Sequence, residues 1–515
     1  MKTPSALLAA TLLAGVPALP PPARAADQPQ FGQAWSRNMV SAERGLPEGF
    51  DPVAGTHLRW QAALGTESHG TPVIAGGRVY VGTNNGQPRD PRHQGDRGVL
   101  LCLDEKDGRL LWQLVVPKRE EDPYLDWPKA GISSAPTVED DRVYLVDNRG
   151  VLLCLDARGL ANGNDGPFRD EGAYLTPRGT NAPPAPLTPG PLDADILWSF
   201  DLTTGAGIWS HDGAHSAILI RGDHLYLNTG TGVDNTHKKI RTPDAPSLVV
   251  FDKRTGRYLA RDREGIAPEI FHCTWSGPSL ARIDGREQVL FAAGNGILYA
   301  FEPLPPGGGP EESLAGVAPL RKLWQFDPDL EAPKTGVHRY NGNRAVSPVN
   351  FYGMPVAVGD RLYLAGGGDW FWGKHEAWVK CLDPAGAGPD HPPRVVWTAP
   401  LGRHTMATPA VAHGLVFATD SLRQLHCLDA ATGQEVWKHE LGGEIWASAL
   451  VADGRVYVGT RRGDFWTFAA RREKQLLQRV ELGAPISATA VAANGTLYVS
   501  TMSRLFAAAR TPAAP

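Results

Sequence analysis

The sequence is poor in several residue types, and each scarcity narrows what the protein can be. Its 515 residues include only five cysteines and five methionines, and the formal net charge is −4. No block of basic residues occurs, so we expect no nucleic-acid partner. After the N-terminal leader, no stretch is apolar enough to span a bilayer. What the chain does have is 58 glycines and 44 prolines, a composition that favours many turns over long helices.

The N-terminus has the pattern of a secretory signal peptide. Lys2 precedes an apolar run from Ala6 to Leu19, and Ala23-Arg24-Ala25 forms a small-x-small cleavage site. We therefore expect residues 1–25 to be removed and the mature protein to be periplasmic or secreted. Five cysteines in an exported chain would ordinarily suggest disulfide bonds.

A strand pattern recurs eight times, and this repetition determines the expected fold. Each copy has a polar turn, then alternating residues of high strand propensity, then a second polar turn. The copies are GGRVYVGTNNG at Gly76, DDRVYLVDNRG at Asp140, GDHLYLNTGTG at Gly222, REQVLFAAGNG at Arg286, GDRLYLAGGGD at Gly359, HGLVFATDSLR at His413, DGRVYVGTRRG at Asp453 and NGTLYVSTMSR at Asn494.

A second motif follows most copies, and HCLDAATGQEVW from His426 is a full example. The acid accepts backbone N–H bonds in a tight turn, the glycine supplies a positive φ, and the tryptophan begins an outer strand that packs on the neighbouring sheet. The terminal positions are Trp112, Trp198, Tyr258, Trp324, Trp397, Trp437 and Leu477. The shortest spacing between them, about forty residues, is typical of one propeller blade.

These repeats predict an all-β fold, an eight-bladed β-propeller of four-stranded antiparallel blades. Trp60 looks like an outer-strand residue with no blade before it. We expect its strand to pair near Leu505–Ala509 and to close the ring. The expected domains are an N-terminal extension at 26–57, the propeller at 58–510 with an insertion at about 157–193, and a tail at 511–515.

The Asp-x-x-Thr-Gly-x-x-x-Trp pattern of Asp429–Trp437 resembles the repeat of pyrroloquinoline-quinone-type (PQQ-type) propellers. That superfamily includes quinoprotein alcohol dehydrogenases and the propeller lipoprotein that assists outer-membrane protein assembly. GEIWASALVADGRVYVGTRRGDFW and APISATAVAANGTLYVSTM are similar to exported PQQ-like propeller proteins. The resemblance covers nearly all of the mature chain and implies the fold, whereas function has to be argued from the site.

The cysteines depart from the dehydrogenase pattern. The chain has neither the adjacent cysteine pair of quinoprotein alcohol dehydrogenases nor a Cys-x-x-Cys-His haem motif. Cys102, Cys154, Cys381 and Cys427 each stand two residues before a turn acid, in four different blades. Neighbouring blades lie about 10 Å apart, beyond disulfide reach, so we interpret these four as small buried residues. Cys273 is expected near the central channel instead.

One position of the repeat, three residues before the usual Pro or Ala, should surround a mouth of the central channel. Its members are His69, Ser133, His215, Trp275, Tyr352, Met406, Trp446 and Ser487, with His211, His272, Cys273, His338, Arg344 and His404 nearby.

Three interpretations of this mouth remain open. It is a wet polar channel, or a quinone or small-molecule pocket, or a transition-metal site. In a pocket, Trp275 or Trp446 would stack on a flat ring and Arg344 would hold carboxylates, with His69, His215 and His404 as further candidates. A metal site would use His69, His215 and Met406, His272 or Cys273, a ligand set suited to copper. The cofactor thus stays unknown, with PQQ, copper and calcium as alternatives.

Two loops add candidates. Asp156, Asn162, Asn164 and Asp165 cluster oxygen ligands suited to calcium, although such residues also form turns. Trp370, Phe371 and Trp372, followed by Lys374 and His375, form either an aromatic lip over a binding face or a packed loop.

The sequence leads us to expect a monomeric binding or scaffold module of the cell envelope that presents one face to a small molecule or an envelope protein. The alternative is a quinone- or metal-dependent periplasmic oxidoreductase, a PQQ-type dehydrogenase if it is an enzyme, with its site at the channel mouth.

Overall fold

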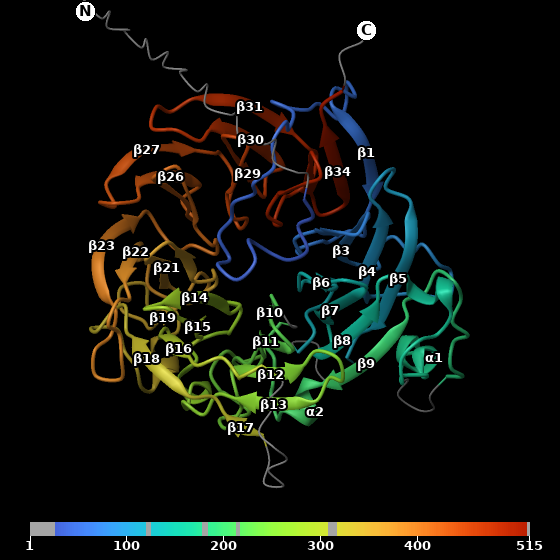
Figure 1. Cartoon of the computed structure of the whole chain (residues 1–515), viewed down its shortest axis with the longest axis horizontal. Coiled ribbons are helices and arrows are strands. Elements are labelled where there is room, and N and C mark those ends of the chain that lie inside the picture. Colours follow the sequence, from blue (N-terminus) through green and yellow to red (C-terminus); the bar gives the residue numbers. More distant parts are fainter. Residues whose placement is uncertain (1–25, 120–124, 178–183, 213–216, 307–316, 512–515) are drawn as a thin grey trace, which may run out of the picture.

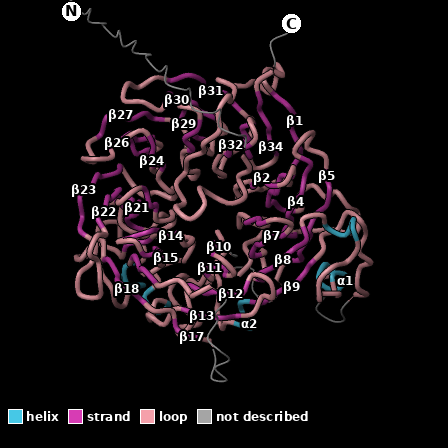
Figure 2. The backbone as a smooth tube through the Cα atoms, viewed as in Figure 1, coloured by secondary structure: helices cyan, strands magenta, loops and turns pink. Residues whose placement is uncertain are grey.

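The computed structural model describes residues 26–119, 125–177, 184–212, 217–306 and 317–511, so the signal peptide predicted at residues 1–25 lies outside the described residues. Eight sheets stand around a central axis like the blades of a propeller (Figure 1). Nearly all regular structure is strand, and the short helices lie in connections between strands (Figure 2). The predicted all-β, eight-bladed fold is confirmed.

The first four blades follow chain order. Blade 1 contains β2 (Val73–Ala75), β3 (Arg78–Asn84), β4 (Arg97–Asp104) and β5 (Leu110–Pro117). Blade 2 contains β6 (Thr137–Glu139), β7 (Arg142–Val146), β8 (Val151–Asp156) and β9 (Ile196–Asp201), with η1 (Gly159–Asn162) and α1 (Glu171–Leu175) between its last two strands. After α2 (Leu202–Gly205), blade 3 contains β10 (Leu219–Arg221), β11 (His224–Asn228), β12 (Leu248–Asp252) and β13 (Tyr258–Arg261), extended by β17 (Ala318–Pro319). After η2 (Ala267–Glu269), blade 4 contains β14 (Ser279–Ile283), β15 (Arg286–Ala292), β16 (Leu298–Phe301) and β18 (Lys322–Phe326).

The last four blades complete the ring. After η3 (Val337–Tyr340), blade 5 contains β19 (Val349–Asn350), β20 (Val356–Val358), β21 (Arg361–Gly368), β22 (Ala377–Asp383) and β23 (Arg394–Leu401). Blade 6 contains β24 (Ala410–Ala412), β25 (Leu415–Thr419), β26 (Gln424–Asp429) and β27 (Glu435–Glu440). Blade 7 contains β28 (Leu450–Ala452), β29 (Arg455–Gly459), β30 (Asp464–Ala469) and β31 (Leu476–Glu481). Blade 8 contains β32 (Val491–Ala493), β33 (Thr496–Ser500), β34 (Arg504–Ala509) and the N-terminal strand β1 (Leu58–Ala63).

Strand β1 closes the ring as the orphan Trp60 predicts. It runs antiparallel to β34, with Trp60 opposite Ala507 and Ala62 opposite Leu505. The first and last parts of the chain therefore share one sheet. Because the ring is closed, each blade has a neighbouring blade on both sides.

The tryptophans of the repeat join neighbouring blades. The indole Nε1 of Trp60 donates to Glu105 O at 2.9 Å, that of Trp397 to Ala430 O at 3.0 Å and that of Trp437 to Arg471 O at 3.0 Å. Each acceptor belongs to the next blade. The indole ring of Trp397 lies so close to the turn of the next blade that a Cβ on Gly433 would approach it to 2.5 Å. The turn glycine is therefore required by packing as well as by its φ of +72°.

The repeated cysteines occupy a scaffold position, as expected. All five cysteines are buried and unbonded. Each repeat cysteine stands opposite the outer-strand tryptophan of its own blade: Cys102 opposite Trp112, Cys154 opposite Trp198, Cys381 opposite Trp397 and Cys427 opposite Trp437. A small side chain at this position leaves room for the large ring across the strand pair.

The segment before β1 runs through the middle of the ring (deep blue in Figure 1). It hydrogen-bonds to an inner-strand residue of every blade: Ile74, Val138, Ile220, Leu280, Ala357, Val411, Val451 and Ala492. Its Arg37 is fully buried and donates to the carbonyls of Phe31, Ala217 and Pro278 at 3.0–3.1 Å. This segment thus acts as a plug that ties the eight blades together at the axis.

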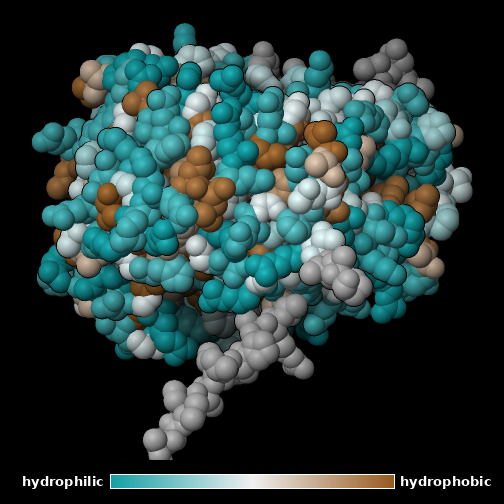
Figure 3. All heavy atoms as spheres, turned by 90° about the horizontal axis from the view of Figure 1, so that it is seen from above, coloured by the Kyte–Doolittle hydropathy of each residue, from teal (hydrophilic) through white to brown (hydrophobic). Residues whose placement is uncertain are grey.

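The outer surface is mostly polar. Seen from above the view of Figure 1, it is hydrophilic with small, separate hydrophobic patches (Figure 3). Among the described residues, no helix is long and apolar enough to cross a membrane.

Candidate functional site

A cavity of about 590 Å³ lies on the propeller axis. Its wall includes seven members of the predicted ring: His69, Ser133, Trp275, Tyr352, Met406, Trp446 and Ser487. The eighth, His215, lies outside the described residues. Phe31 of the plug also lines the cavity, as do His237, His272, Phe371 and Trp372. The repeat alignment therefore locates the cavity, because equivalent positions in each blade face the same axis.

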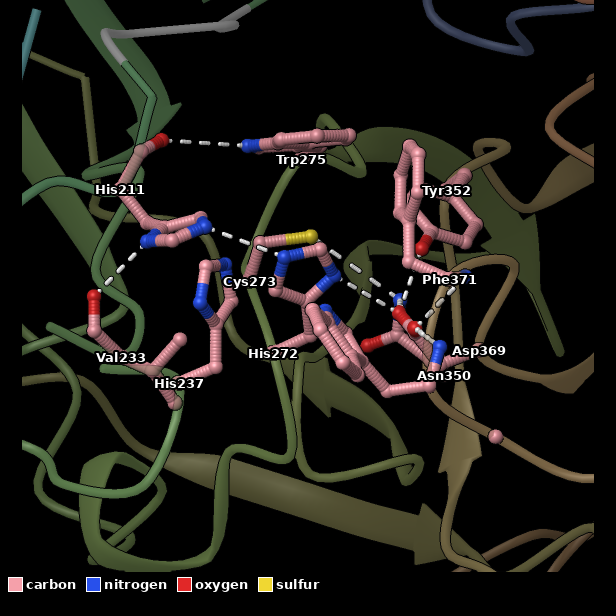
Figure 4. Close-up of polar contacts among 12 residues, drawn as sticks. His211, Val233, His237, His272, Cys273, Trp275, Asn350, Tyr352, Asp369 and Phe371 are labelled. Atoms are coloured by element: carbon pink, nitrogen blue, oxygen red, sulfur yellow. Dashed lines mark hydrogen bonds and ion pairs between the residues drawn. The ribbon is translucent and has the colours of Figure 1, made fainter. Parts of the chain in front are cut away.

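Two buried histidines meet at one side of this cavity (Figure 4). His211 Nδ1 lies 2.8 Å from the carbonyl oxygen of Val233, and His272 Nδ1 lies 2.8 Å from Asp369 Oδ2. Both partners accept hydrogen bonds, so both Nδ1 atoms carry a proton. The Nε2 atoms of the two rings are 3.0 Å apart. In their neutral forms the two rings would therefore direct lone pairs at each other, and a positive centre between them is needed.

A third histidine completes the cluster. The available ring nitrogens of His211, His237 and His272 all lie within 4.8 Å of one another. His237 is half-buried and packs against Trp372, with ring centroids 5.0 Å apart. Asp212 Oδ2 lies 3.3 Å from His211 Nε2 and adds a carboxylate at the edge of the cluster.

A hydrogen-bond network fixes the His272 ring at its Nδ1 atom. Asp369 is fully buried, and its Oδ2 accepts from Tyr352 Oη at 2.5 Å as well as from His272. Its Oδ1 accepts the backbone N–H groups of Phe371 and Trp372 at 2.9 and 2.7 Å. Burial alone would raise the pKa of Asp369, but the charge and hydrogen bond of His272, together with the hydrogen bonds from Tyr352 and Trp372, outweigh burial and lower it. The carboxylate therefore remains ionised and fixes the orientation of the His272 ring.

Burial and nearby charges shift the pKa values of His211 and His272 in opposite directions. Burial, with the nearby charges of His272 and His237, holds the pKa of His211 well below its usual value. For His272, burial opposes the charged form, yet the Asp369 carboxylate prevails and raises its pKa. The cluster thus contains one imidazole, His211, whose protonation is disfavoured, and one, His272, whose protonated form is stabilised by a carboxylate.

The loops that carry the cluster have unusual backbone conformations. Asp212 and His237 have φ values of +58° and +56°, a left-handed region in which Asp and His are more common than most residues. Gly232 lets three segments approach closely, because a Cβ there would lie 2.5 Å from His272 O and 2.8 Å from His211 Cβ. Such local strain is concentrated at binding sites in proteins.

The remaining predicted site residues are placed as follows. His69 stacks on Trp446 with ring centroids 6.1 Å apart, and the Arg461 guanidinium lies 4.0 Å from the Trp446 ring. Arg344 donates to the carbonyls of Gly373 and Phe371 and so stabilises the loop of Trp370, Phe371 and Trp372.

Two further predicted residues stabilise loops near the cavity. His404 Nε2 lies 2.7 Å from Lys374 O, beside Trp370. Cys273 is buried with its Sγ 3.9 Å from Asn350 Nδ2, and burial raises the pKa of its thiol well above the usual value. A protonated thiol in this setting is a poor metal ligand.

In the insertion, Asp156 and Asp165 come together with Asp195, and their carboxylate oxygens lie within 4.8 Å of one another. Asn162 and Asn164 instead direct amide nitrogens to the carboxylates of Asp165 and Glu171 at 2.7 Å.

Sequence reasoning missed His237, Asp212 and Asp369. His237 stands in the basic stretch NTHKKIR, whose composition is typical of a solvated loop. Asp369 follows a strand in GGGDWFW, and its proximity to His272 depends on the contact between blades 4 and 5. The available signal was an acid directly after three glycines at the end of β21.

Comparisons with known proteins agree with this fold. A family model described as outer membrane protein assembly factor BamB matches residues 45–162 and 375–511. The crystal structure of BamB from Moraxella catarrhalis superimposes with a TM-score of 0.54 at 13% identity, covering 87% of this chain and 97% of that one. The computationally designed Ika8 protein gives a TM-score of 0.50 at 11% identity, covering 87% of this chain and 99% of that one.

A curated relative from Pseudomonas sp., lupanine 17-hydroxylase [cytochrome c], is 23% identical over 424 residues. The match covers 77% of this chain and 53% of the relative, so the chain spans about half the length of that protein. The repeated motif, the eight blades and the family model lead to one conclusion: the chain belongs to the PQQ-type β-propeller family.

Proposed function

We propose that this protein is an exported, metal-dependent oxidoreductase that acts on a small organic molecule bound in the axial cavity. The observation that carries the proposal is the 3.0 Å separation of two Nε2 atoms whose rings are both protonated at Nδ1. One positive centre, a proton or a metal ion, has to lie between them. A third imidazole within 4.8 Å favours the metal ion.

The ligand set indicates a transition metal. Imidazole nitrogens bind copper and zinc well, at about 2.0–2.1 Å for zinc. A carboxylate behind a histidine ligand, here Asp369 behind His272, is the usual outer partner of such sites. Three protein ligands leave a coordination position free for water or substrate. A copper ion held there would supply one-electron redox chemistry, and the chain would position the substrate.

The cavity suits a flat, largely uncharged molecule. Its volume of about 590 Å³ lies in the usual range for small-ligand sites. Trp275, Trp372, Phe371 and Trp446 offer aromatic faces, and Asp212 and Glu67 add negative charge.

PQQ fits this cavity poorly. PQQ is a tricarboxylate and needs several cationic partners. Among the described residues of the wall, Arg461 is the one arginine or lysine, and it is stacked on Trp446. We therefore assign no step to a quinone.

The curated relative supports the reaction class. Its name describes a hydroxylase that works with cytochrome c. A redox role for the present chain agrees with that name, although the likeness is low and extends over half of the relative.

The experiment is metal analysis of the full-length protein exported by its host, followed by electron paramagnetic resonance and an assay with aromatic and heterocyclic alcohols and a dye as electron acceptor. We expect about one copper ion per chain; zinc alone, which has no redox chemistry, would support the metal centre but not the oxidoreductase. The ion should be lost in His272→Ala and retained in His391→Ala, whose histidine is exposed on a surface loop. A protein that stays metal-free after incubation with copper and zinc would refute the metal centre, and a metal-loaded protein that reduces no acceptor would refute the oxidoreductase.

A second candidate is a scaffold for envelope proteins. The observation in its favour is the family model, whose description names an outer membrane protein assembly factor. Under this hypothesis the protein remains metal-free, and cross-linking in the cell joins it to an outer-membrane assembly protein.

A further inference from the structure

Three aspartates meet where the blade 2 insertion folds back onto its blade, and the charge of Glu171 acts on one of them, Asp195. Asp156 ends β8, Asp195 stands directly before β9, Glu171 begins α1, and Asp165 lies in the loop between η1 and α1. Asp165 donates its backbone N–H to Asp195 Oδ2 at 2.9 Å, which holds the loop against the blade. Residues far apart in the insertion are thus brought to one point.

Two of these acids are buried with an oxygen that has no partner. Asp195 is 0% exposed and Glu171 is 1% exposed. Asp195 Oδ1 and Glu171 Oε1 accept no hydrogen bond from any residue that the structure describes. No lysine or arginine among the described residues forms an ion pair with any of the four carboxylates. An ionised carboxylate buried without a partner is costly, so this arrangement needs a positive charge.

A neighbouring acidic group has its own positive charge. Asp90, His93 and Asp193 also place ligand atoms within 4.8 Å of one another. There, Arg92 donates to Asp90 at 2.5 Å and to Asp193 at 2.9 Å and supplies the positive charge. The described part of the chain places no such arginine at the group around Asp195.

We propose that Asp156, Asp165, Glu171 and Asp195 form a calcium site that fastens the insertion to blade 2. Carboxylate oxygens at about 2.3–2.6 Å are the ligands that calcium prefers, and oxygens up to about 5 Å apart can share one ion. The observed 4.8 Å limit for the three aspartates meets this condition.

The nearby charges and amides agree with such a site. Burial raises the pKa of Asp195 to about 6; the charges of Glu171, Asp156 and Asp165 add to this rise, and the hydrogen bond from Asp165 N–H opposes it. Asn162 and Asn164 donate to the outer oxygens of Asp165 and Glu171 and orient them. The sequence predicts calcium ligands in the same loop, but two of the four ligands proposed here, Glu171 and Asp195, come from beyond the motif.

The experiment uses the full chain, stripped with a chelator and then titrated with calcium chloride while thermal unfolding is followed. At about 100-fold excess over the dissociation constant, calcium should raise the unfolding midpoint by about 3 °C. Terbium luminescence, sensitised by nearby aromatic rings and displaced by calcium, gives a second readout.

Asp195→Asn keeps the side-chain shape and removes one buried charge. We expect it to fold with an unchanged or higher midpoint without calcium and to lose the calcium-dependent rise, as should Glu171→Gln. Glu473→Gln, at an exposed position, should retain the rise. His272→Ala should retain it too, which separates this site from the axial cavity. An unchanged wild-type midpoint in calcium, or an equal rise in Asp195→Asn, would overturn the proposal.

Discussion

The Nε2 atoms of His211 and His272 lie 3.0 Å apart, although hydrogen-bond acceptors hold both rings with their protons on the opposite nitrogen. The two rings come from blades 3 and 4, and Asp369 from blade 5 fixes the second of them. Because this geometry depends on three blades, it is a property of the assembled ring. It also makes the tautomer of His272 the feature on which the proposed metal site depends.

Asp369→Asn tests that dependence. The amide would place either an N–H group or a weaker acceptor opposite His272 Nδ1, so the ring would no longer be held with its Nε2 lone pair towards His211. We expect copper or zinc affinity to fall about 10–100-fold. Competition with a chromophoric chelator measures this change.

Tyr352→Phe is the matched control. It removes another donor to the same Asp369 oxygen but leaves the carboxylate in place to orient His272. Metal affinity should stay within a few-fold of wild type. An equal loss in both variants would mean that the network acts through stability alone.

Gly433→Ala and Gly442→Ala compare two glycines with the same φ of +72°. At Gly442 a Cβ meets nothing within 4 Å, so its cost is the left-handed backbone alone, about 1–2 kcal/mol. At Gly433 the Cβ also approaches the Trp397 ring to 2.5 Å, which adds about 1–3 kcal/mol of overpacking. Urea unfolding should therefore give a lower midpoint for Gly433→Ala. Equal midpoints would show that contact with the tryptophan does not constrain the turn.

The fold could be predicted from the sequence because the same motif recurs in several blades. Asp429, Gly433 and Trp437 each have counterparts in other blades, so the blade number, the closing strand and the ring around the axis could all be predicted. The candidate site could not be predicted in full, because His237 and Asp369 have no counterparts and their positions depend on how long loops of different blades meet. The same applies to Asp195, which lies well beyond the Asn-Gly-Asn-Asp stretch of the insertion.

The cysteines provide a third prediction. Burial raises the pKa of Cys427 to about 12 and that of Cys381 to about 11. Thiolates are the reactive form, so we expect a thiol reagent such as dithionitrobenzoate to label the native protein very slowly and to label five thiols after denaturation. The thermal midpoint should be the same with and without a reductant. Rapid labelling of the native protein, or a lower midpoint in reductant, would contradict the scaffold role.

Arg37→Met tests whether the plug stabilises the ring. Arg37 donates to three buried carbonyls, and among the described residues no carboxylate forms an ion pair with it. Methionine fills much of the same space but leaves those acceptors unpaired. Burial disfavours the guanidinium charge and lowers the pKa of Arg37 to about 9. Removing that buried charge should therefore recover part of the stability that is lost with the hydrogen bonds. We expect a net destabilisation of about 2 kcal/mol, with faster hydrogen exchange in residues 26–41. Arg44→Met, in the same segment but exposed, should change neither quantity, and equal behaviour of the two variants would show that the plug is not fastened through Arg37.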